Sequence, residues 1–320
     1  MTTIRWGIIG CGDVCEVKSG PGLYKARDSA LVAVMRRDGA KAADFARRHG
    51  VARSYDDADA LIGDRDVDAV YVATPPDSHK DYTLRAAAAG KHVLVEKPMA
   101  LSVAECEAMV AGCRDAGVNL YVAYYRRALP RFEALRRLVQ DGTLGSIRLV
   151  LVRHLWSPEQ VPGSAWRVDP AINGGGIFVD TQSHTLDWLD HVFGPPRRVS
   201  GAALNQSGRS AAEDAVGAVL TYPGDVLASF ACAYAADSFE DSVTIIGDRG
   251  RARMGFLGPS PITLESTAGT RTIDLQDPPH VHQPFVQQVV DHLNGGALPA
   301  GQPEAGVRVN RALAQILVSH

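Results

Sequence analysis

The chain opens with IRWGIIGCGDVC at residues 4–15, an apolar run followed at once by the pattern G-x-G-x-x-C. The apolar run predicts a buried strand, and the glycines predict a tight turn into a helix. Gly10 permits the turn, and Gly12 lets backbone amides approach a pyrophosphate at the helix N-terminus. Cys15 takes the place of the usual third glycine or alanine and is nearly as small. We expect this turn to bind a dinucleotide through Gly10, Gly12, Asp13 and Val14; the alternative is a plain strand–helix turn.

Short apolar runs alternate with helical stretches over the first third of the chain. Apolar runs lie at residues 31–35, 69–73, 92–95 and 120–123, and helical patterns lie at 40–49, 78–89 and 102–115. Strands that alternate with helices predict right-handed βαβ units and a parallel sheet with helices on both faces. We therefore expect residues 1–123 to form a doubly wound α/β domain.

The pattern changes in the remaining residues, 124–320. Strand-like segments follow one another at residues 147–153, 215–222, 226–234, 242–246, 251–254, 262–265 and 271–275, and helices are expected at 130–141, 180–192, 284–293 and 303–318. Alternation of apolar and polar residues in these strands predicts a half-buried antiparallel sheet. The second domain is expected to be α+β, with a mostly antiparallel open sheet.

Composition excludes several classes of protein. The 320 residues include 46% hydrophobic and 22% charged residues, as in ordinary globular domains, and the formal net charge of −3 argues against a basic nucleic-acid surface. Five cysteines without a C-x-x-C pair argue against a disulfide framework or a structural zinc site. No apolar run approaches the roughly 18–20 residues that cross a bilayer. With a strand-like run starting at residue 4 and no room for a signal peptide, we expect a cytoplasmic protein without membrane contact.

Two arginines follow the second predicted strand, where NAD-binding domains usually carry an acidic residue. Arg36 and Arg37 precede Asp38. Guanidinium groups suit a ribose 2′-phosphate, so NADP(H) is the expected cofactor. The alternative is a solvated basic turn with Asp38 bound to the ribose of NAD.

A lysine and an Asp/His pair carry the predicted chemistry. Lys97 follows the apolar run 92–95, at the sheet edge where such folds bind ligands. Asp180 and His184 are four residues apart and therefore share one face of a helix. An amine, an imidazole and a carboxylate around a nicotinamide form a plausible proton relay for hydride transfer. The Asp/His pair could instead be a metal half-site or a pair on the helix surface. No further ligands lie at suitable spacing, so no metal is expected.

These residues resemble the Gfo/Idh/MocA oxidoreductases over nearly the whole chain. The motifs that carry the resemblance are the turn at residues 10–15, A-T-P-P at 73–76 with His79, A-G-K-H-V-L-V-E-K-P at 89–98, W-R at 166–167, G-G-G at 174–176, and D-x-x-x-H at 180–184. The resemblance implies a Rossmann domain followed by an α/β domain whose open sheet makes contacts in a homo-oligomer, a dimer or a tetramer. It also implies that Lys97 is the catalytic lysine and that Asp180 and His184 complete the active site.

Further site residues are implied by the resemblance alone. Thr74, Pro75, His79 and Glu96 would lie along the cofactor with Lys97, and Tyr124, Trp166 and Arg167 would border the nicotinamide or the substrate. The family also implies that the substrate is a secondary alcohol or ketone of a sugar, cyclitol or related polyol. Two other hypotheses are a dinucleotide-binding sensor or co-repressor without turnover, and a nicotinamide-dependent glycosidase.

Four other features are expected to be structural. The arginines at positions 126, 127, 131, 136 and 137 are expected to form a solvated helix face, and the alternative is that one of them turns toward the active-site cleft. His280 and His282 are expected in an exposed turn rather than in a metal site, and Cys106 and Cys113 in the core. Asp187 and Asp190 are expected to be structural rather than catalytic.

Overall fold

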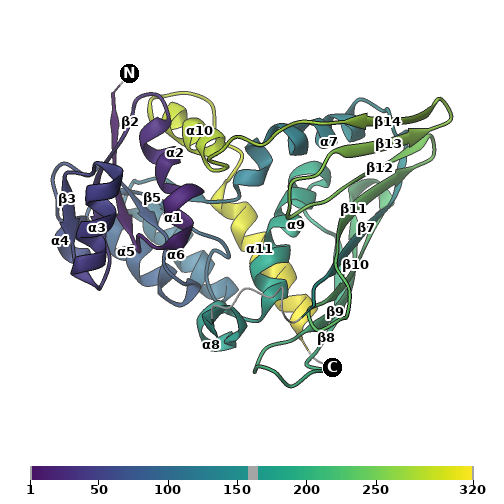
Figure 1. Cartoon of the computed structure of the whole chain (residues 1–320), viewed down its shortest axis with the longest axis horizontal. Helices are drawn as coiled ribbons and strands as arrows, with labels where there is room; N and C mark the ends of the chain where they lie inside the picture. The colour runs from purple at the N-terminus through teal and green to yellow at the C-terminus, as the bar shows by residue number, and fades with distance from the viewer. Residues whose placement is uncertain (1, 158–164, 319–320) are drawn as a thin grey trace. The chain divides into compact units, whose positions relative to one another are not determined.

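The computed structural model describes residues 2–157 and 165–318. Contacts divide the chain into two compact units (Figure 1). The N-terminal unit runs to Leu129 and also includes Pro278–Val307, and the C-terminal unit consists of Pro130–Asp277 and the residues from Arg308 onward. The sequence predicted a single boundary between residues 123 and 124. The contacts place the first boundary after Leu129 and also assign residues 278–307 to the N-terminal unit.

The N-terminal unit is built on a six-stranded sheet of order β3-β2-β1-β4-β5-β6. Its strands are β1 (Ile4–Ile9), β2 (Ser29–Met35), β3 (Arg53–Tyr55), β4 (Ala69–Val72), β5 (His92–Val95) and β6 (Leu120–Val122). Neighbouring strands are parallel throughout. All four side chains of β4 are buried, which requires cover on both faces of the sheet. The predicted doubly wound parallel sheet is confirmed, although β3 was not predicted.

Helices join these strands at positions that the sequence marks. They are α1 (Asp13–Val17), α2 (Gly20–Lys25), α3 (Gly39–His49), α4 (Ala58–Ile62), α5 (His79–Ala88), α6 (Val103–Asp115) and α10 (Gln283–Leu293), with 3₁₀ turns η1 (Pro76–Ser78) and η2 (Tyr125–Ala128). The side chain of Asp38 accepts a hydrogen bond from the backbone of Lys41, and Ser102 accepts one from Glu105. Such caps fix where a helix begins, because they satisfy amides that have no partner within the helix.

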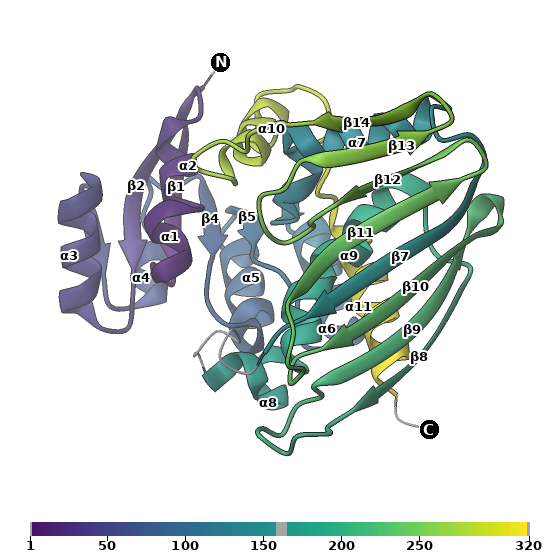
Figure 2. The same cartoon turned by 45° about the vertical axis from the view of Figure 1, so that its right-hand side comes forward.

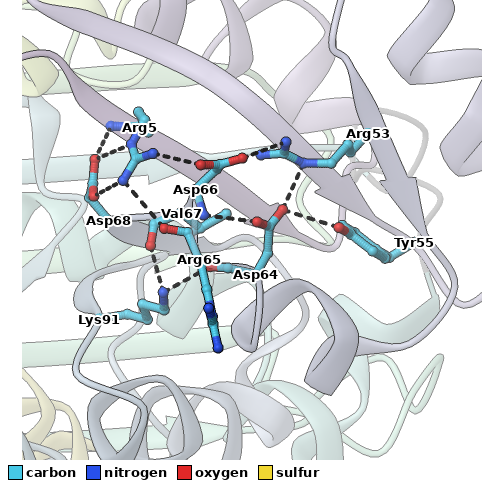
Figure 3. Close-up of polar contacts among 9 residues, drawn as sticks. All are labelled: Arg5, Arg53, Tyr55, Asp64, Arg65, Asp66, Val67, Asp68 and Lys91. Carbon is cyan, nitrogen blue, oxygen red and sulfur yellow. Dashed lines mark hydrogen bonds and ion pairs between the residues drawn. The ribbon is translucent and has the colours of Figure 1, made fainter.

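A polar network connects residues near the start of β1 with the segments that lead into β4 and β5 (Figure 3). Asp68 accepts from the Arg5 guanidinium at 2.9 and 2.8 Å. The Lys91 ammonium donates to the carbonyl oxygens of Asp64 and Val67 at 2.9 and 2.6 Å. Because ligands of such sheets bind at the carboxyl ends of the strands, this network at the amino ends holds the sheet together rather than a ligand.

The C-terminal unit contains an eight-stranded sheet of order β14-β13-β12-β11-β7-β10-β9-β8. Its strands are β7 (Ile147–Leu155), β8 (Arg198–Leu204), β9 (Ala215–Tyr222), β10 (Val226–Ala233), β11 (Glu240–Gly247), β12 (Gly250–Met254), β13 (Ile262–Ser266) and β14 (Gly269–Ile273). Only the central pair β7 and β10 is parallel among the pairings of the described strands. The predicted mostly antiparallel sheet is therefore confirmed.

One face of this sheet is covered by helices, as Figure 2 shows for α9. The helices of this unit are α7 (Pro130–Gln140), α8 (Pro170–Asn173), α9 (Ile177–Phe193) and, from Arg308 onward, α11 (Pro303–Leu317), with turns η3 (Ala165–Val168) and η4 (Pro223–Asp225). Phe178 of α9 contacts Phe230 of β10 edge-on, and Phe132 of α7 contacts Trp188 of α9. On the other face, alternate residues of β8, β9 and β10 are exposed.

Burial corrects two predictions from the sequence and confirms a third. Arg126, Arg127 and Arg131 are 7%, 8% and 3% exposed, so this part of the arginine run is not a solvated face. His282 is 1% exposed and does not lie in an exposed turn. Cys106 and Cys113 are core residues as predicted, and all five cysteines are buried and free. No helix within residues 2–157 and 165–318 has the length and apolar character needed to cross a membrane.

Candidate active site

The glycine turn after β1 is shaped by close contacts at Gly10 and by open space at Gly12. Gly10 has φ +88°, and a Cβ there would lie 2.7 Å from Cγ2 of Thr74. At Gly12, the N-cap of α1, a Cβ would meet only the Gly10 carbonyl oxygen, at 3.8 Å, and no side chain caps the helix. Packing therefore demands glycine at position 10 but not at position 12. The open space and the uncapped amides of Asp13 and Val14 fit a bound pyrophosphate.

Cys15, the unusual third residue of the turn, lies in the core of the N-terminal unit. Cys15 is fully buried, and burial raises its pKa well above the usual thiol range. Cys11 is buried as well, which raises its pKa to about 11. Both thiols are therefore protonated at neutral pH and act as small apolar groups.

The end of β2 presents two arginines and an aspartate with different surroundings. Arg36 is half-buried and Arg37 is exposed, and neither forms an ion pair with any described residue. The Asp38 carboxylate caps α3 and pairs with the Lys41 ammonium at 3.2 Å, which lowers its pKa. Asp38 is thus already used inside the protein, whereas both guanidinium groups are available to a ligand.

His79 links the two loops that leave β4 and β5. Its Nε2 lies 2.8 Å from the carbonyl oxygen of Thr74, and its Nδ1 lies 3.1 and 3.2 Å from those of Pro98 and Met99. The ring is fully buried, and burial lowers its pKa, while the nearby carbonyl oxygens oppose that shift. The structure therefore places His79 as a connection between loops 74–76 and 96–99.

Glu96 and Lys97 follow β5 directly, at the carboxyl edge of the sheet. Glu96 is 8% exposed, and its Oε1 accepts from the Tyr71 hydroxyl at 2.5 Å. Its Oε2 accepts from the backbone amide of Lys97 at 3.2 Å. Lys97 itself is half-buried, and Tyr124, just after β6, is fully buried. These residues form the part of the predicted site that belongs to the N-terminal unit.

The C-terminal unit holds the remaining predicted site residues on η3 and α9. Asp180 and His184 lie one turn apart in the first half of α9, and His184 is 4% exposed. Arg167 Nε lies 3.2 Å from Asp180 Oδ2, and the same guanidinium covers the Trp166 ring at 4.5 Å. Trp166, Arg167, Asp180 and His184 are thus assembled within one unit. Their convergence with Lys97 of the other unit stays a prediction.

Two residues that were not predicted from the sequence, Asn173 and Glu213, hold the start of α9. The Asn173 side-chain amide donates to the carbonyl oxygens of Arg167, Gly175 and Gly176. Glu213 Oε1 accepts from the Gly176 backbone amide at 2.8 Å. A Cβ on Gly176 would lie 2.6 Å from the Glu213 carbonyl oxygen, which explains why glycine stands there. The triple glycine was the only signal in the sequence that pointed to this close packing.

A buried polar cluster lies beside Asp180 and His184 on the sheet side of α9. His154 at the end of β7 receives a hydrogen bond from the Gln182 amide at 3.0 Å, and its Nδ1 lies 3.3 Å from the Tyr234 hydroxyl. Tyr234 in turn lies 3.3 Å from the Thr181 hydroxyl. No sequence pattern indicates this cluster, because its members come from three separate segments. It fixes the rotation of α9 about its axis.

The described residues contain no group of three or more His, Cys, Asp or Glu side chains arranged to hold a metal ion. A doubly wound sheet with an open glycine turn, a lysine at its carboxyl edge and a second, mostly antiparallel sheet fits the class of nicotinamide-dependent oxidoreductases.

Comparisons with known proteins assign the family. The model of the oxidoreductase family with an NAD-binding Rossmann fold, GFO_IDH_MocA, matches residues 4–124, and the model of the GFO/IDH/MocA C-terminal domain matches residues 132–253. The chain belongs to the Gfo/Idh/MocA family and is an NAD(P)-dependent oxidoreductase.

Similar proteins cover most of the chain. Oxidoreductase P35 of Formosa agariphila is 37% identical over 294 residues, which are 91% of each chain. Trans-1,2-dihydrobenzene-1,2-diol dehydrogenase of Sus scrofa is 33% identical over 252 residues, 78% of this chain and 74% of that protein. The crystal structure of aldose-aldose oxidoreductase from Caulobacter crescentus complexed with glycerol has a TM-score of 0.87 at 26% identity and covers 98% of this chain and 96% of that chain.

Proposed function

We propose that the protein transfers a hydride between NADP(H) and a secondary alcohol or ketone carbon of a sugar, cyclitol or related polyol. The observation that carries this proposal is the pairing of Arg167 with Asp180 on the helix that also bears His184. A charged, half-buried pair beside a buried imidazole suits a substrate with several hydroxyl groups, because both donors and acceptors are present.

The residues of the N-terminal unit fit the cofactor. Gly12 and the free amides of α1 would bind the pyrophosphate, and Arg36 and Arg37 would bind the 2′-phosphate of NADP(H). Thr74, Pro75 and Glu96 would line the cofactor, and His79 would hold their loops in place. NAD(H) is the alternative cofactor, since the family as a whole is NAD(P)-binding. When bound, the nicotinamide supplies the acceptor or donor of the hydride.

The side chains proposed as catalytic have complementary roles. Lys97 and His184 would exchange the proton on the substrate oxygen, because an amine and an imidazole can each release and take up a proton. Asp180 would orient His184 or bind a neighbouring hydroxyl. Positive charge near the oxygen would stabilise the developing alkoxide and provide much of the rate enhancement.

The substrate class is supported by the similar proteins. One of them is named for a trans-1,2-diol and another for aldoses. Both compounds carry a secondary alcohol beside a second hydroxyl group. Trp166 offers an apolar face and Arg167 offers donors, a combination that suits a polyol with one less polar side.

We also propose that the protein forms a homo-oligomer through the uncovered face of the C-terminal sheet. Leu204, Val219 and Leu227 of β8, β9 and β10 are 55%, 45% and 38% exposed there. Exposed apolar side chains gathered on one face are typical of an interaction surface. Sedimentation should show a dimer or tetramer for the native chain and a smaller species for Val219→Lys. A native monomer would contradict this part of the proposal.

The free cysteines favour a reducing compartment.

A substrate panel tests the proposed activity. Aldoses, cyclitols, polyols and trans-diols would be supplied with NADP⁺ or NAD⁺, and the corresponding ketones with the reduced cofactors. We expect a change in the absorbance of the reduced cofactor with at least one polyol or its ketone, larger with NADP(H). Cofactor binding without turnover on the whole panel would contradict the proposal and favour a sensor.

A further inference from the structure

Tyr71 places a buried hydroxyl next to the proposed catalytic lysine. It is the one polar side chain of β4, whose sequence is AVYV, and it is fully buried. Its hydroxyl donates to Glu96 Oε1 at 2.5 Å. Burial and the neighbouring carboxylate raise the pKa of Tyr71 well above its usual range. The phenol is therefore protonated at any working pH and remains a donor to Glu96.

Glu96 connects this hydroxyl to the backbone of Lys97. While Oε1 binds Tyr71, Oε2 accepts from the Lys97 amide at 3.2 Å. Both carboxylate oxygens are thus engaged inside the protein, and the carboxylate is 8% exposed. A hydrogen bond to a charged acceptor in such surroundings is stronger than one between neutral groups. This contact holds the backbone amide of the residue that bears the proposed catalytic amine.

His282 reaches the same carboxylate from a distant part of the chain. Its segment joins the N-terminal unit after the C-terminal sheet, and the His282 amide donates to the Lys18 carbonyl oxygen at 3.3 Å. The imidazole stacks on Tyr125 at 4.1 Å between ring centroids and meets the edge of Tyr71 at 6.5 Å. Its Nε2 lies 3.8 Å from Glu96 Oε1, which is too long for a hydrogen bond. His282 therefore acts on Glu96 by packing.

The charges around His282 keep its ring neutral. Burial lowers the pKa of His282 to about 3, and the cations of Lys18, Lys97 and Arg126 contribute to this shift. The negative group that faces the ring is Glu96, and the hydroxyl-bearing neighbours are Tyr71 and Tyr125. A neutral ring fills the space beside Glu96 without adding a positive charge that would repel Lys97.

We propose that Tyr71, Glu96 and His282 form a buried bracket that positions Lys97. Glu96 binds the lysine's backbone amide, Tyr71 fixes one oxygen of Glu96, and His282 closes the space around it. The proposal rests on the proposed function in one respect, that Lys97 is the catalytic amine. It assigns positioning roles to Tyr71 and His282, two residues from segments that carry none of the predicted site residues.

The test measures the Lys97 amine directly. The full-length protein would be acetylated with acetic anhydride between about pH 7 and pH 9, where lysine labelling follows the fraction of free amine. Mass spectrometry would give the rate at Lys97 and, as an internal reference, at the exposed Lys41. The variants are Tyr71→Phe, His282→Ala and His282→Phe. The matched control is Tyr121→Phe, which removes another buried hydroxyl of the same sheet, 2.7 Å from Nδ1 of His292 on α10.

We expect Tyr71→Phe and His282→Ala to change the rate of acetylation at Lys97 by roughly threefold or more. A shift of about half a unit in the pKa of the amine would have this effect. His282→Phe keeps the stacked ring and should restore the native rate. With a substrate from the panel, Tyr71→Phe should lower kcat by roughly tenfold, the effect of one hydrogen bond to a charged group, and leave the KM for the cofactor unchanged.

The results that would overturn the bracket differ from the result that would overturn the proposed function. Native labelling of Lys97 in both Tyr71→Phe and His282→Ala, or an equal change in Tyr121→Phe, would overturn the bracket whatever the activity. Full turnover of Lys97→Ala would overturn the proposed function and leave the labelling result standing. If His282→Ala does not fold, Tyr71→Phe decides alone, because it removes one oxygen atom and leaves the ring in place.

Discussion

Arg167 Nε lies 3.2 Å from Oδ2 of Asp180, so the proposed catalytic carboxylate already has a cationic partner from η3. The guanidinium is held in turn by the Trp166 ring, and the Arg167 carbonyl oxygen is bound by Asn173. Because Arg167 is held at its guanidinium and at its backbone, the pair with Asp180 loses less side-chain entropy on forming than a pair of exposed residues does. Asp180 therefore enters the proposed reaction in a defined position.

Replacing the arginine tests whether this pair serves the reaction. We expect Arg167→Gln to lower kcat/KM by roughly 10-fold, the effect of losing one charge-assisted hydrogen bond. Arg148→Gln is the control, because it breaks an exposed Arg–Asp pair, with Asp248 at 2.9 Å, in the same unit. Steady-state kinetics with the best substrate of the panel would measure both. Equal rates for the two variants would mean that the Arg167–Asp180 pair is structural.

Removal of the proposed catalytic amine should have a much larger effect. We expect Lys97→Ala to lower turnover by roughly 10²–10⁴-fold, the usual size of a lost acid–base group. The dissociation constant of the cofactor, measured by fluorescence, should change little by comparison. Lys80→Ala, which removes an ammonium paired with Glu105 in the same unit, serves as control. Unchanged turnover in Lys97→Ala would remove the lysine from the mechanism.

The choice of cofactor depends on Arg36 and Arg37. We expect Arg36→Asp to weaken the binding of NADPH much more than that of NADH, because a carboxylate repels the 2′-phosphate and can bind a 2′-hydroxyl. Titration of each cofactor by fluorescence would give both dissociation constants. Arg27→Asp, an exposed change of the same charge, controls for the field of the whole unit. Equal weakening of both cofactors in Arg36→Asp would argue against NADP(H).

Much of the fold could be predicted from the sequence, because its strands are continuous apolar runs. β1, β4 and β5 coincide with such runs to within one residue. The edge strands β3 and β8 were not predicted: β3 has only three residues, RSY, and β8 is half-exposed with a glycine at its centre. Neither strand carries the periodicity that reveals a buried one.

The site was predictable where residues are close in sequence and not where they are distant. The spacing of Asp180 and His184 predicts that they share one helix face, and both lie on α9, one turn apart. The burial of His282 and the contact of Glu213 with Gly176 depend on segments far apart in the chain, and no local pattern records them. The solvated face predicted for the arginines of residues 126–131 was wrong for the same reason, since Arg131 is buried and pairs with Asp277, a distant residue, at 3.0 Å.

Glu213 gives a prediction on stability against pH. Burial raises its pKa above the usual glutamate value, and its Oε1 accepts from the Gly176 amide at the start of α9. An acid whose pKa is raised by folding stabilises the folded state most below its unfolded pKa, and this contribution is lost as the pH rises through the folded pKa. The raised pKa therefore makes the native chain less stable at neutral pH than below the unfolded pKa of this carboxyl group.

Glu213→Gln keeps an oxygen that can accept from Gly176 and removes the charge. We expect its Tm, relative to that of the native chain, to rise as the pH increases from about 4 to about 7, because Glu213 loses its proton more easily in the unfolded chain than in the folded one, and glutamine has no proton to lose. Glu304→Gln, an exposed change, should show no such trend. Thermal unfolding at a series of pH values would measure it. A Tm difference that stays constant or falls over this interval would contradict a raised pKa of Glu213 in the folded chain.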